Sequence, residues 1–194
     1  FIGEQIGLLE AAHEEYRYIF GFEESYGYLA GTYVRDKDAV VASMLICEMA
    51  AYYRSIGMSL LDAREAMYKK YGNYVHTVES FTCEGASGME EMAKIMDDLH
   101  ANTPDSIAGF KVVKVADYLS SVTTDLATKK TEPITLPKSD VICFTLENGA
   151  TVIIRPSGTE PKIKAYYTTI AANRADAEAL SKKLSADFKA KLGF

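Results

Sequence analysis

The first part of the chain passes from a helical hydrophobic pattern to an extended one, which is typical of an α/β unit. Apolar residues at positions 2, 6 and 9 recur at helical spacing, and the aromatic run of residues 16–22 predicts a buried strand. A second helix is predicted to follow, with an apolar stripe that we expect to be core. The stripe consists of Val41, Met44, Leu45, Met49, Tyr52 and Ile56.

Polar residues and glycine mark where the helices of this first part begin and end. Asp36 or Asp38 is placed to cap the helix that carries the apolar stripe. The next helix begins at Ser59, with Asp62 in a capping-box-like arrangement, and stops before Gly72. The pattern changes after Gly72, so we predict a domain boundary there, with domains at residues 1–72 and 73–194.

The second part alternates between strands and helices, with strands in the majority. Helices are expected from Ser87, which forms a second capping box with Glu90, and from Arg174. Asn148-Gly149 is a strong hairpin signal between two apolar runs, whereas residues 120–138 predict a surface connection or a poorly ordered loop. The expected fold is a mostly antiparallel sheet with helices that cover one face. The expected strands are residues 74–81, 111–116, 141–146, 151–154 and 162–169.

Composition narrows the class of protein. With 194 residues, 48% hydrophobic and 25% charged, the chain is an ordinary globular protein of one large or two small domains. A net charge of −6 with dispersed basic residues makes nucleic acid and anionic membranes poor partners. No signal peptide or membrane-length apolar run is seen, so we expect a cytoplasmic location. Cys47, Cys83 and Cys143 are widely spaced, and we expect them to be reduced and mostly buried.

The segment at residues 155–161, Arg-Pro-Ser-Gly-Thr-Glu-Pro, combines the groups that bind a phosphate. These donors are a guanidinium fork, two hydroxyls and an unhindered backbone amide, supplied by Arg155, Ser157, Thr159 and Gly158. Lys162 and Lys164 follow on the next predicted strand, where they share one face. A tight turn with solvated basic residues would produce the same local pattern.

A second polar cluster, Glu23-Glu24-Ser25-Tyr26-Gly27, follows the first predicted strand. In open α/β sheets, ligands bind at that end of a strand. The simpler interpretation is that Glu23 and Ser25 cap the next helix or hold a turn. The alternating charges of residues 35–38 have a similar second interpretation, as a solvated helix cap. His13, His76 and His100 show no spacing of metal ligands.

Three stretches together resemble the α-D-phosphohexomutases, the family of phosphoglucomutases and phosphomannomutases. They are GFEESYGYL at residues 21–29, VRDKDAV at residues 34–40 and RPSGTEPKIKAYY at residues 155–167, in the family's order. Three motifs in order are more specific than any one of them. The resemblance covers nearly the whole chain and is closest to the phosphoglucomutase branch that carries a Phe-Glu-Glu-Ser-Tyr-Gly loop.

The resemblance implies a domain assignment, because members of the family have four domains. Residues 1–72 would be the C-terminal part of the third domain, a remnant of a mixed α/β sheet. Residues 73–194 would be the fourth domain, a TBP-like, mostly antiparallel sheet of four to five strands packed with two helices.

The resemblance also implies roles for particular residues. Glu23 and Ser25 match a loop that contacts the hydroxyls of the sugar ring, and Lys37 matches a lysine near the reacting centre. Lys164 matches a basic residue that supports the phosphate site. The loop that grips the phosphate not undergoing transfer corresponds to Arg155, Ser157, Gly158 and Thr159.

The implied reaction interconverts glucose 1-phosphate and glucose 6-phosphate through glucose 1,6-bisphosphate. The family's phosphorylated serine lies in a Ser-His-Asn sequence, and its Mg²⁺ is held by an Asp-Gly-Asp-Gly-Asp run. Neither string occurs here, so we expect a fragment that binds a phosphosugar, depends on upstream domains and is inactive alone. The alternatives are a phosphomannomutase, a non-catalytic phosphosugar-binding module and a protein-interaction domain, and the oligomeric state stays open.

Overall fold

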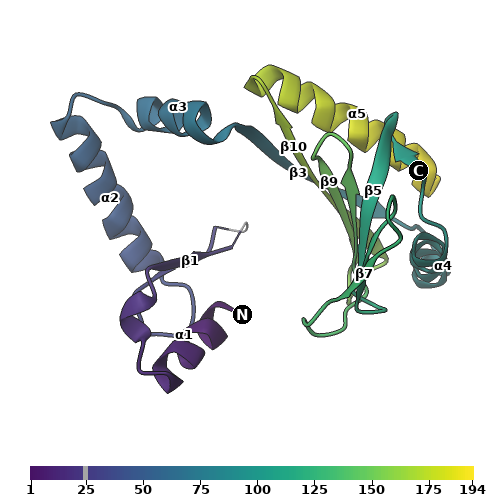
Figure 1. Cartoon of the computed structure of the whole chain (residues 1–194), viewed down its shortest axis with the longest axis horizontal. Helices are drawn as coiled ribbons and strands as arrows, with labels where there is room; N and C mark the ends of the chain where they lie inside the picture. The colour runs from purple at the N-terminus through teal and green to yellow at the C-terminus, as the bar shows by residue number, and fades with distance from the viewer. Residues whose placement is uncertain (24–25) are drawn as a thin grey trace. The chain divides into compact units, whose positions relative to one another are not determined.

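The computed structural model describes residues 1–23 and 26–194, and the chain forms two compact units (Figure 1). Unit 1 comprises Phe1–Met67 and unit 2 comprises Tyr68–Phe194. The division falls inside a helix, whose last turn belongs to unit 2. There the Arg174 guanidinium donates to the Tyr68 hydroxyl at 3.1 Å. The predicted domain boundary after Gly72 stays a prediction.

Unit 1 is built from helices and one two-stranded antiparallel ribbon, in which Gly21 lies opposite Leu29. The predicted buried strand over residues 16–22 is wrong in length and in burial. Its first part forms a 3-10 turn, and Phe20 and Phe22 are exposed because no described residue covers the ribbon's outer face. The elements are α1 (Ile2–Ala11), η1 (Glu15–Arg17), β1 (Phe20–Phe22), β2 (Tyr28–Ala30), α2 (Ala39–Ser55) and α3 (Leu60–Tyr71).

The helix α2 begins as expected but does not bury its apolar stripe. Of the two candidate caps, Asp38 is the one observed: its carboxylate accepts the N–H of Val40 at 2.8 Å and of Val41 at 3.2 Å. The core prediction for the stripe is wrong, because α2 contains no buried residue. Met44 is 58% exposed and Tyr52 is 60% exposed.

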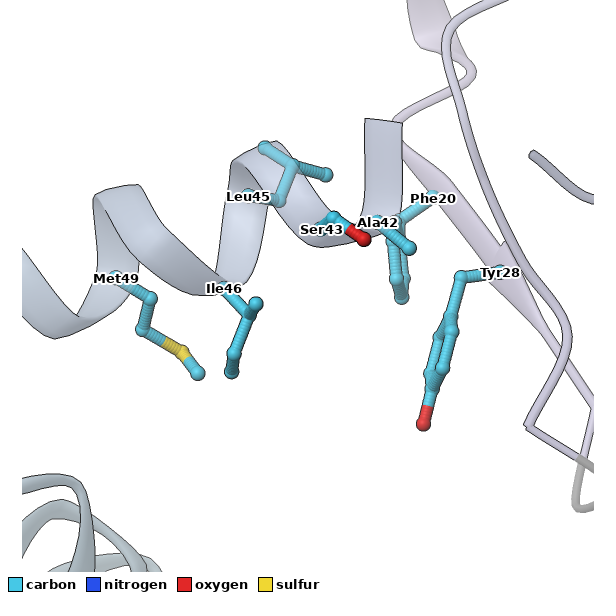
Figure 2. Close-up of a pocket in the computed structure, with 7 residues that line it drawn as sticks. All are labelled: Phe20, Tyr28, Ala42, Ser43, Leu45, Ile46 and Met49. Carbon is cyan, nitrogen blue, oxygen red and sulfur yellow. The ribbon is translucent and has the colours of Figure 1, made fainter. Parts of the chain in front are cut away.

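The uncovered surface of α2 continues onto the ribbon and forms an apolar pocket of about 550 Å³ (Figure 2). The rings of Phe20 and Tyr28 stack there with their centroids 6.0 Å apart. The pocket is lined by Phe20, Tyr28, Ala42, Ser43, Leu45, Ile46 and Met49. The α2 residues that line this pocket therefore face open space among the described residues.

The start of α3 confirms the first capping box. The backbone N–H of Ser59 donates to Asp62 Oδ2 at 2.8 Å, and the N–H of Asp62 donates to Ser59 Oγ at 3.1 Å. In the described chain, no single helix is long and apolar enough to cross a membrane, and only α2 with α3, as a pair bent by 87°, has the length and composition of a span.

Unit 2 is organised on one antiparallel sheet with the strand order β3-β10-β9-β8-β5-β6-β7, and β4 pairs with β5 (Figure 1). This confirms the predicted α/β class and the mostly antiparallel sheet with helices. Its elements are β3 (Asn73–Thr82), α4 (Gly88–Ala101), β4 (Ser106–Ile107), β5 (Phe110–Asp117), β6 (Val122–Asp125), β7 (Thr131–Pro133), β8 (Ile142–Leu146), β9 (Thr151–Pro156), β10 (Lys162–Ala171) and α5 (Arg174–Leu192).

The sheet has more strands than predicted, because the segment 120–138 is not a loop. It contains β6 and β7, which extend the sheet beyond β5, with Thr124 opposite Val115. The turn between these strands is closed by Asp125, whose carboxylate accepts the N–H of Thr128 at 2.7 Å. The Asn148-Gly149 hairpin between β8 and β9 is confirmed, with Gly149 at φ +82°.

The core of unit 2 lies between the sheet and both helices α4 and α5. Alternate strand residues such as Val152 and Ile154 on β9 point into it, and Leu184 and Phe188 of α5 belong to the same buried cluster. The predicted capping box at Ser87 is wrong, because its side chain makes no capping hydrogen bond. The fully buried large side chains of unit 2 are Tyr167, Phe144, Phe188, Met96, Ile107, Ile142, Leu146, Ile154, Ile163 and Leu184.

Candidate functional site

The loop between β9 and β10 is anchored at both ends by backbone hydrogen bonds. The N–H of Ser157 donates to the carbonyl of Lys162 at 2.7 Å, so the strand pairing continues into the loop. The N–H of Cys83, just after β3, donates to the carbonyl of Pro161 at 2.9 Å. These bonds hold the loop against two strands of the sheet, which limits its motion.

Inside the loop, the side chain of Ser157 organises the backbone. Its Oγ accepts the N–H groups of Thr159 at 3.4 Å and of Glu160 at 3.3 Å. Its own hydroxyl proton is left to donate outward. Gly158 is exposed and a side chain there would meet open space, so a ligand oxygen can approach its N–H closely.

The basic residues beside the loop differ in whether their charge is already neutralised. Lys162 Nζ lies 3.1 Å from Glu160 Oε2 and forms an ion pair with it. Arg155 and Lys164 lie directly opposite each other on β9 and β10, and both are exposed. No ion pair involves either of them within the described residues. An anion at this end of the sheet would therefore meet Arg155 and Lys164 as uncompensated charges.

The predicted sugar-recognition loop lies in unit 1, and only part of it can be described. Ser25, which we expected to contact the sugar, lies outside the described residues. The backbone N–H of Glu23 donates to the carbonyl of Gly27 at 2.8 Å, which closes the loop. Lys37 Nζ lies 3.4 Å from Glu23 Oε1 and 2.7 Å from Asp36 Oδ1. The fold thus brings together Glu23 and Lys37, which lie in two separate sequence motifs.

The ion pairs of Lys37 hold it in the charged form. The hydrogen bond to the Asp36 carboxylate, with the negative charges of Asp36 and Glu23, raises the pKa of Lys37 above its ordinary value. The same hydrogen bond lowers the pKa of Asp36. Gly27 packs against the stem of Lys37, since a Cβ at Gly27 would lie only 2.6 Å from Lys37 Cγ. A Cβ at this position would therefore displace the Lys37 side chain.

One polar cluster was not predicted from the sequence. His100, in the last turn of α4, lies with Nδ1 3.0 Å from Asp117 Oδ1 and Nε2 2.8 Å from Asp140 Oδ1. Burial acts to raise the pKa of Asp117, but hydrogen bonds from Ser120 and Leu119 and the charge of His100 outweigh it, and the pKa is lowered. No spacing signal connects these residues, because they come together only through the sheet.

The described residues contain no group of three His, Cys, Asp or Glu side chains placed to hold a metal ion. The part of the chain that the structure describes therefore has no site that fits the Mg²⁺ of the family that this chain resembles. The three cysteines are free: Cys83 is buried, Cys143 is half-buried and Cys47 is exposed.

Comparison with known proteins agrees with this architecture. Residues 83–182 match the model of the phosphoglucomutase/phosphomannomutase C-terminal domain, and residues 7–71 match that of the family's alpha/beta/alpha domain III. The chain belongs to the phosphoglucomutase/phosphomannomutase family. The predicted resemblance is thereby confirmed, and unit 2 contains the residues that match the C-terminal domain of this family.

Individual relatives are similar over most of this chain but are much longer than it. A phosphoglucomutase of Staphylococcus aureus is 40% identical over 168 residues, which are 87% of this chain and 30% of the relative. A phosphoglucomutase of Staphylococcus epidermidis is 40% identical over 154 residues, or 79% and 28% of the two chains. The chain thus spans about 30% of the length of the curated relatives that it matches.

A solved structure shows the same fold. The exocytosis-sensitive phosphoprotein parafusin of Paramecium, described as a phosphoglucomutase in its open form, aligns with a TM-score of 0.59. The alignment covers 98% of this chain and 33% of the Paramecium chain at 15% sequence identity. At that identity the likeness concerns the fold alone.

Proposed function

We propose that this chain is the C-terminal part of a phosphoglucomutase that interconverts glucose 1-phosphate and glucose 6-phosphate through glucose 1,6-bisphosphate. Membership of the family supports the reaction class, and the names of the Staphylococcus relatives support glucose phosphates as substrates. In this proposal the chain supplies phosphate and sugar binding, and upstream domains of the same protein supply the reacting groups.

The observation that carries the proposal is the arrangement of donors at the β9–β10 loop. The Arg155 guanidinium fork has no ion-pair partner among the described residues, Ser157 keeps its hydroxyl proton while its oxygen orders the backbone, and Gly158 presents an accessible N–H. Hydrogen bonds from several directions are what a phosphate monoester requires, because each of its oxygens accepts. Thr159, exposed beside them, completes the proposed phosphate grip.

In unit 1, Glu23 is proposed to accept hydrogen bonds from the sugar hydroxyls together with Ser25. Lys37 supports this loop through its ion pair with Glu23 and keeps a positive charge near the bound sugar. A vicinal diol offers two donors to such a pair of acceptors. Lys37 is therefore a positioning residue in this proposal.

The same proposal predicts that the isolated chain binds but does not catalyse. A phosphohexomutase needs a phosphorylated serine, and the Ser-His-Asn sequence that carries it in the family does not occur in these 194 residues. A coupled assay that reduces a nicotinamide cofactor as glucose 6-phosphate forms should give no rate above the buffer blank. A rate that scales with the concentration of this chain would contradict the proposal.

Two alternative functions make predictions that differ from those of a phosphoglucomutase. A phosphomannomutase would bind mannose 1-phosphate more tightly than glucose 1-phosphate. A phosphosugar-binding module would bind both without any catalytic partner, so supplying the upstream domains of a family member would restore no activity. The sequence encoded before Phe1 separates the second alternative from the enzyme, because the enzyme requires the serine and metal motifs there.

The decisive experiment is an NMR titration of the ¹⁵N-labelled chain with glucose 1-phosphate and glucose 6-phosphate. We expect the amide signals of Arg155, Ser157, Gly158 and Thr159 to move with both ligands. In Arg155→Ala, the loss of charge-assisted hydrogen bonds should weaken binding at least about tenfold. A folded wild-type spectrum with unchanged loop signals in saturating ligand would show that this loop does not bind phosphosugars in the chain as it stands.

A further inference from the structure

A row of side chains crosses three adjacent strands of unit 2 on the sheet face opposite to α4 and α5. Arg155 on β9 lies opposite Lys164 on β10, and Lys164 lies opposite Ser80 on β3. All three are exposed, whereas the alternate residues Ile154 and Ile163 are fully buried in the core on the other face. The strand register therefore places these three polar side chains next to one another.

The row contains two positive charges side by side, which costs stability. Like charges directly opposite each other in an antiparallel pair repel. The charge of Lys162 adds little to this repulsion because it is paired with Glu160. Among the described residues, no carboxylate pairs with Arg155 or Lys164. A bound anion would offset this repulsion, because it would attract both Arg155 and Lys164. The pair is arranged as the two sides of an anion site.

Ser80 completes the row with a hydroxyl that is free to donate. Within the described part of the chain, its side chain makes no hydrogen bond. The neighbouring carboxylate, Glu79, faces the other side of the sheet, where it accepts the hydroxyl of Ser185 in α5. β3 therefore brings a donor and no competing negative charge to the face that carries Arg155 and Lys164.

We propose that the phosphate subsite extends beyond the 155–159 loop across three strands, with Ser80 as a further binding residue beside Arg155 and Lys164. The ligand that fits is the dianion of a phosphate monoester, because two cations match two charges and the hydroxyl binds a further oxygen. The row joins the loop directly, since Ser157 hydrogen-bonds to Lys162, two residues before Lys164. The inference rests on the proposed function and names the phosphate-binding residues more fully.

The first test measures the dissociation constant of glucose 6-phosphate by NMR titration of the full chain. Ser80→Ala should weaken binding about 5- to 10-fold, because a hydrogen bond to a charged oxygen is lost. Ser80→Thr keeps the hydroxyl and should restore most of the affinity. The matched control is Thr151→Val, which removes a hydroxyl from the same face of β9 about 13 Å from Arg155 and should change affinity less than twofold.

The second test uses inorganic phosphate as the ligand and compares variants of the two lysines on β10, Lys162 and Lys164. Lys164→Gln should weaken phosphate binding about tenfold, whereas Lys162→Gln should change it less than about twofold because Glu160 already neutralises that charge. With glucose 6-phosphate as the ligand, the affinity of the wild type should fall as the pH drops below about 6, where the phosphate monoester dianion takes up a proton. Lys164→Gln should show a weaker pH dependence.

The outcomes separate this inference from the proposed function. If glucose 6-phosphate binds and Arg155→Ala abolishes binding, but Ser80→Ala binds like wild type, the subsite ends before β3 and this inference is wrong while the function stands. If inorganic phosphate moves the signals of Ser80 and Lys164 but neither sugar phosphate binds, the anion site is correct and the proposed function is wrong. Equal losses in Lys162→Gln and Lys164→Gln would also overturn the inference.

Discussion

Unit 2 buries a continuous core, whereas unit 1 buries little of its apolar surface. In unit 2, α5 places Leu184 and Phe188 against the sheet with no exposed area. In the described part of unit 1, only Ile6 and Leu29 are buried apolar residues, and α2 leaves Met44 mostly exposed. Both helices have amphipathic sequences, so periodicity predicts that a helix has an apolar side but not that something covers it.

The difference extends to the two parts of the candidate site. In unit 2, the β9–β10 loop is attached to a sheet through backbone hydrogen bonds to Lys162 and Cys83. In unit 1, the loop that contains Glu23 depends on one short ribbon and the ion pairs of Lys37. We therefore expect the β9–β10 loop to be the more rigid of the two parts.

The largest expected contrast comes from one substitution made in both units. Leu184→Ala in α5 empties a fully buried core position and should lower the free energy of unfolding by about 2–5 kcal/mol. Leu61→Ala in α3, where the leucine is 63% exposed, should lower it by less than about 0.5 kcal/mol. Urea unfolding followed by circular dichroism measures both. Equal destabilisation would mean that Leu61 is packed in solution and would remove the contrast.

A smaller contrast is expected from adding one methyl group to a glycine in each unit. In Gly88→Ala, the new Cβ would lie 2.3 Å from the carbonyl oxygen of Cys83, so backbone must move, at a cost of about 1–3 kcal/mol. In Gly27→Ala, the obstacle is the Lys37 side chain, which can swing into solvent at less than about 1 kcal/mol.

Gly27→Ala should instead affect the ligand site, by separating Lys37 from Glu23. Thermal melting compares the two stabilities, and the chemical shift of the Lys37 side chain reports whether the ion pair persists. A Gly27→Ala variant that melts lower than Gly88→Ala would reverse the expected order of the two units.

The smallest effect concerns Asp117, a half-buried carboxylate of unit 2. The pKa of Asp117 is lowered in the folded chain, so its stabilisation is complete above the unfolded pKa of about 3.9 and is lost as the pH falls through the folded pKa. Asp117→Asn should lower stability at neutral pH by about 1–2 kcal/mol and should converge with wild type in acid. Urea unfolding between pH 2 and about pH 7 tests this, with Asp97→Asn on the exposed side of α4 as the control.

Local sequence patterns predicted the elements that depend on near neighbours. The Ser59 and Asp62 capping box and the Asn148-Gly149 hairpin each involve contacts within a few residues, and each was found as expected. The donor loop at residues 155–159 was also evident, because its guanidinium, hydroxyls and glycine are adjacent in sequence.

Features that depend on distant partners were missed or misjudged. The cluster of His100, Asp117 and Asp140 joins α4 to two separate parts of the sheet region, and no periodicity connects them. The polar residues of β6 and β7 predict a surface loop, yet β6 finds backbone partners on β5, and β7 finds them on β6.

Two things could be decided only by packing. One is coverage: the stripes of α2 and α5 look alike in sequence, but only the stripe of α5 meets a sheet. The other is register, which places Ser80, Lys164 and Arg155 in one row although β3 is far from β10 in the chain. Periodicity and turn chemistry act over a few residues and can be read locally, whereas burial and cross-strand contact depend on which distant segment lies opposite.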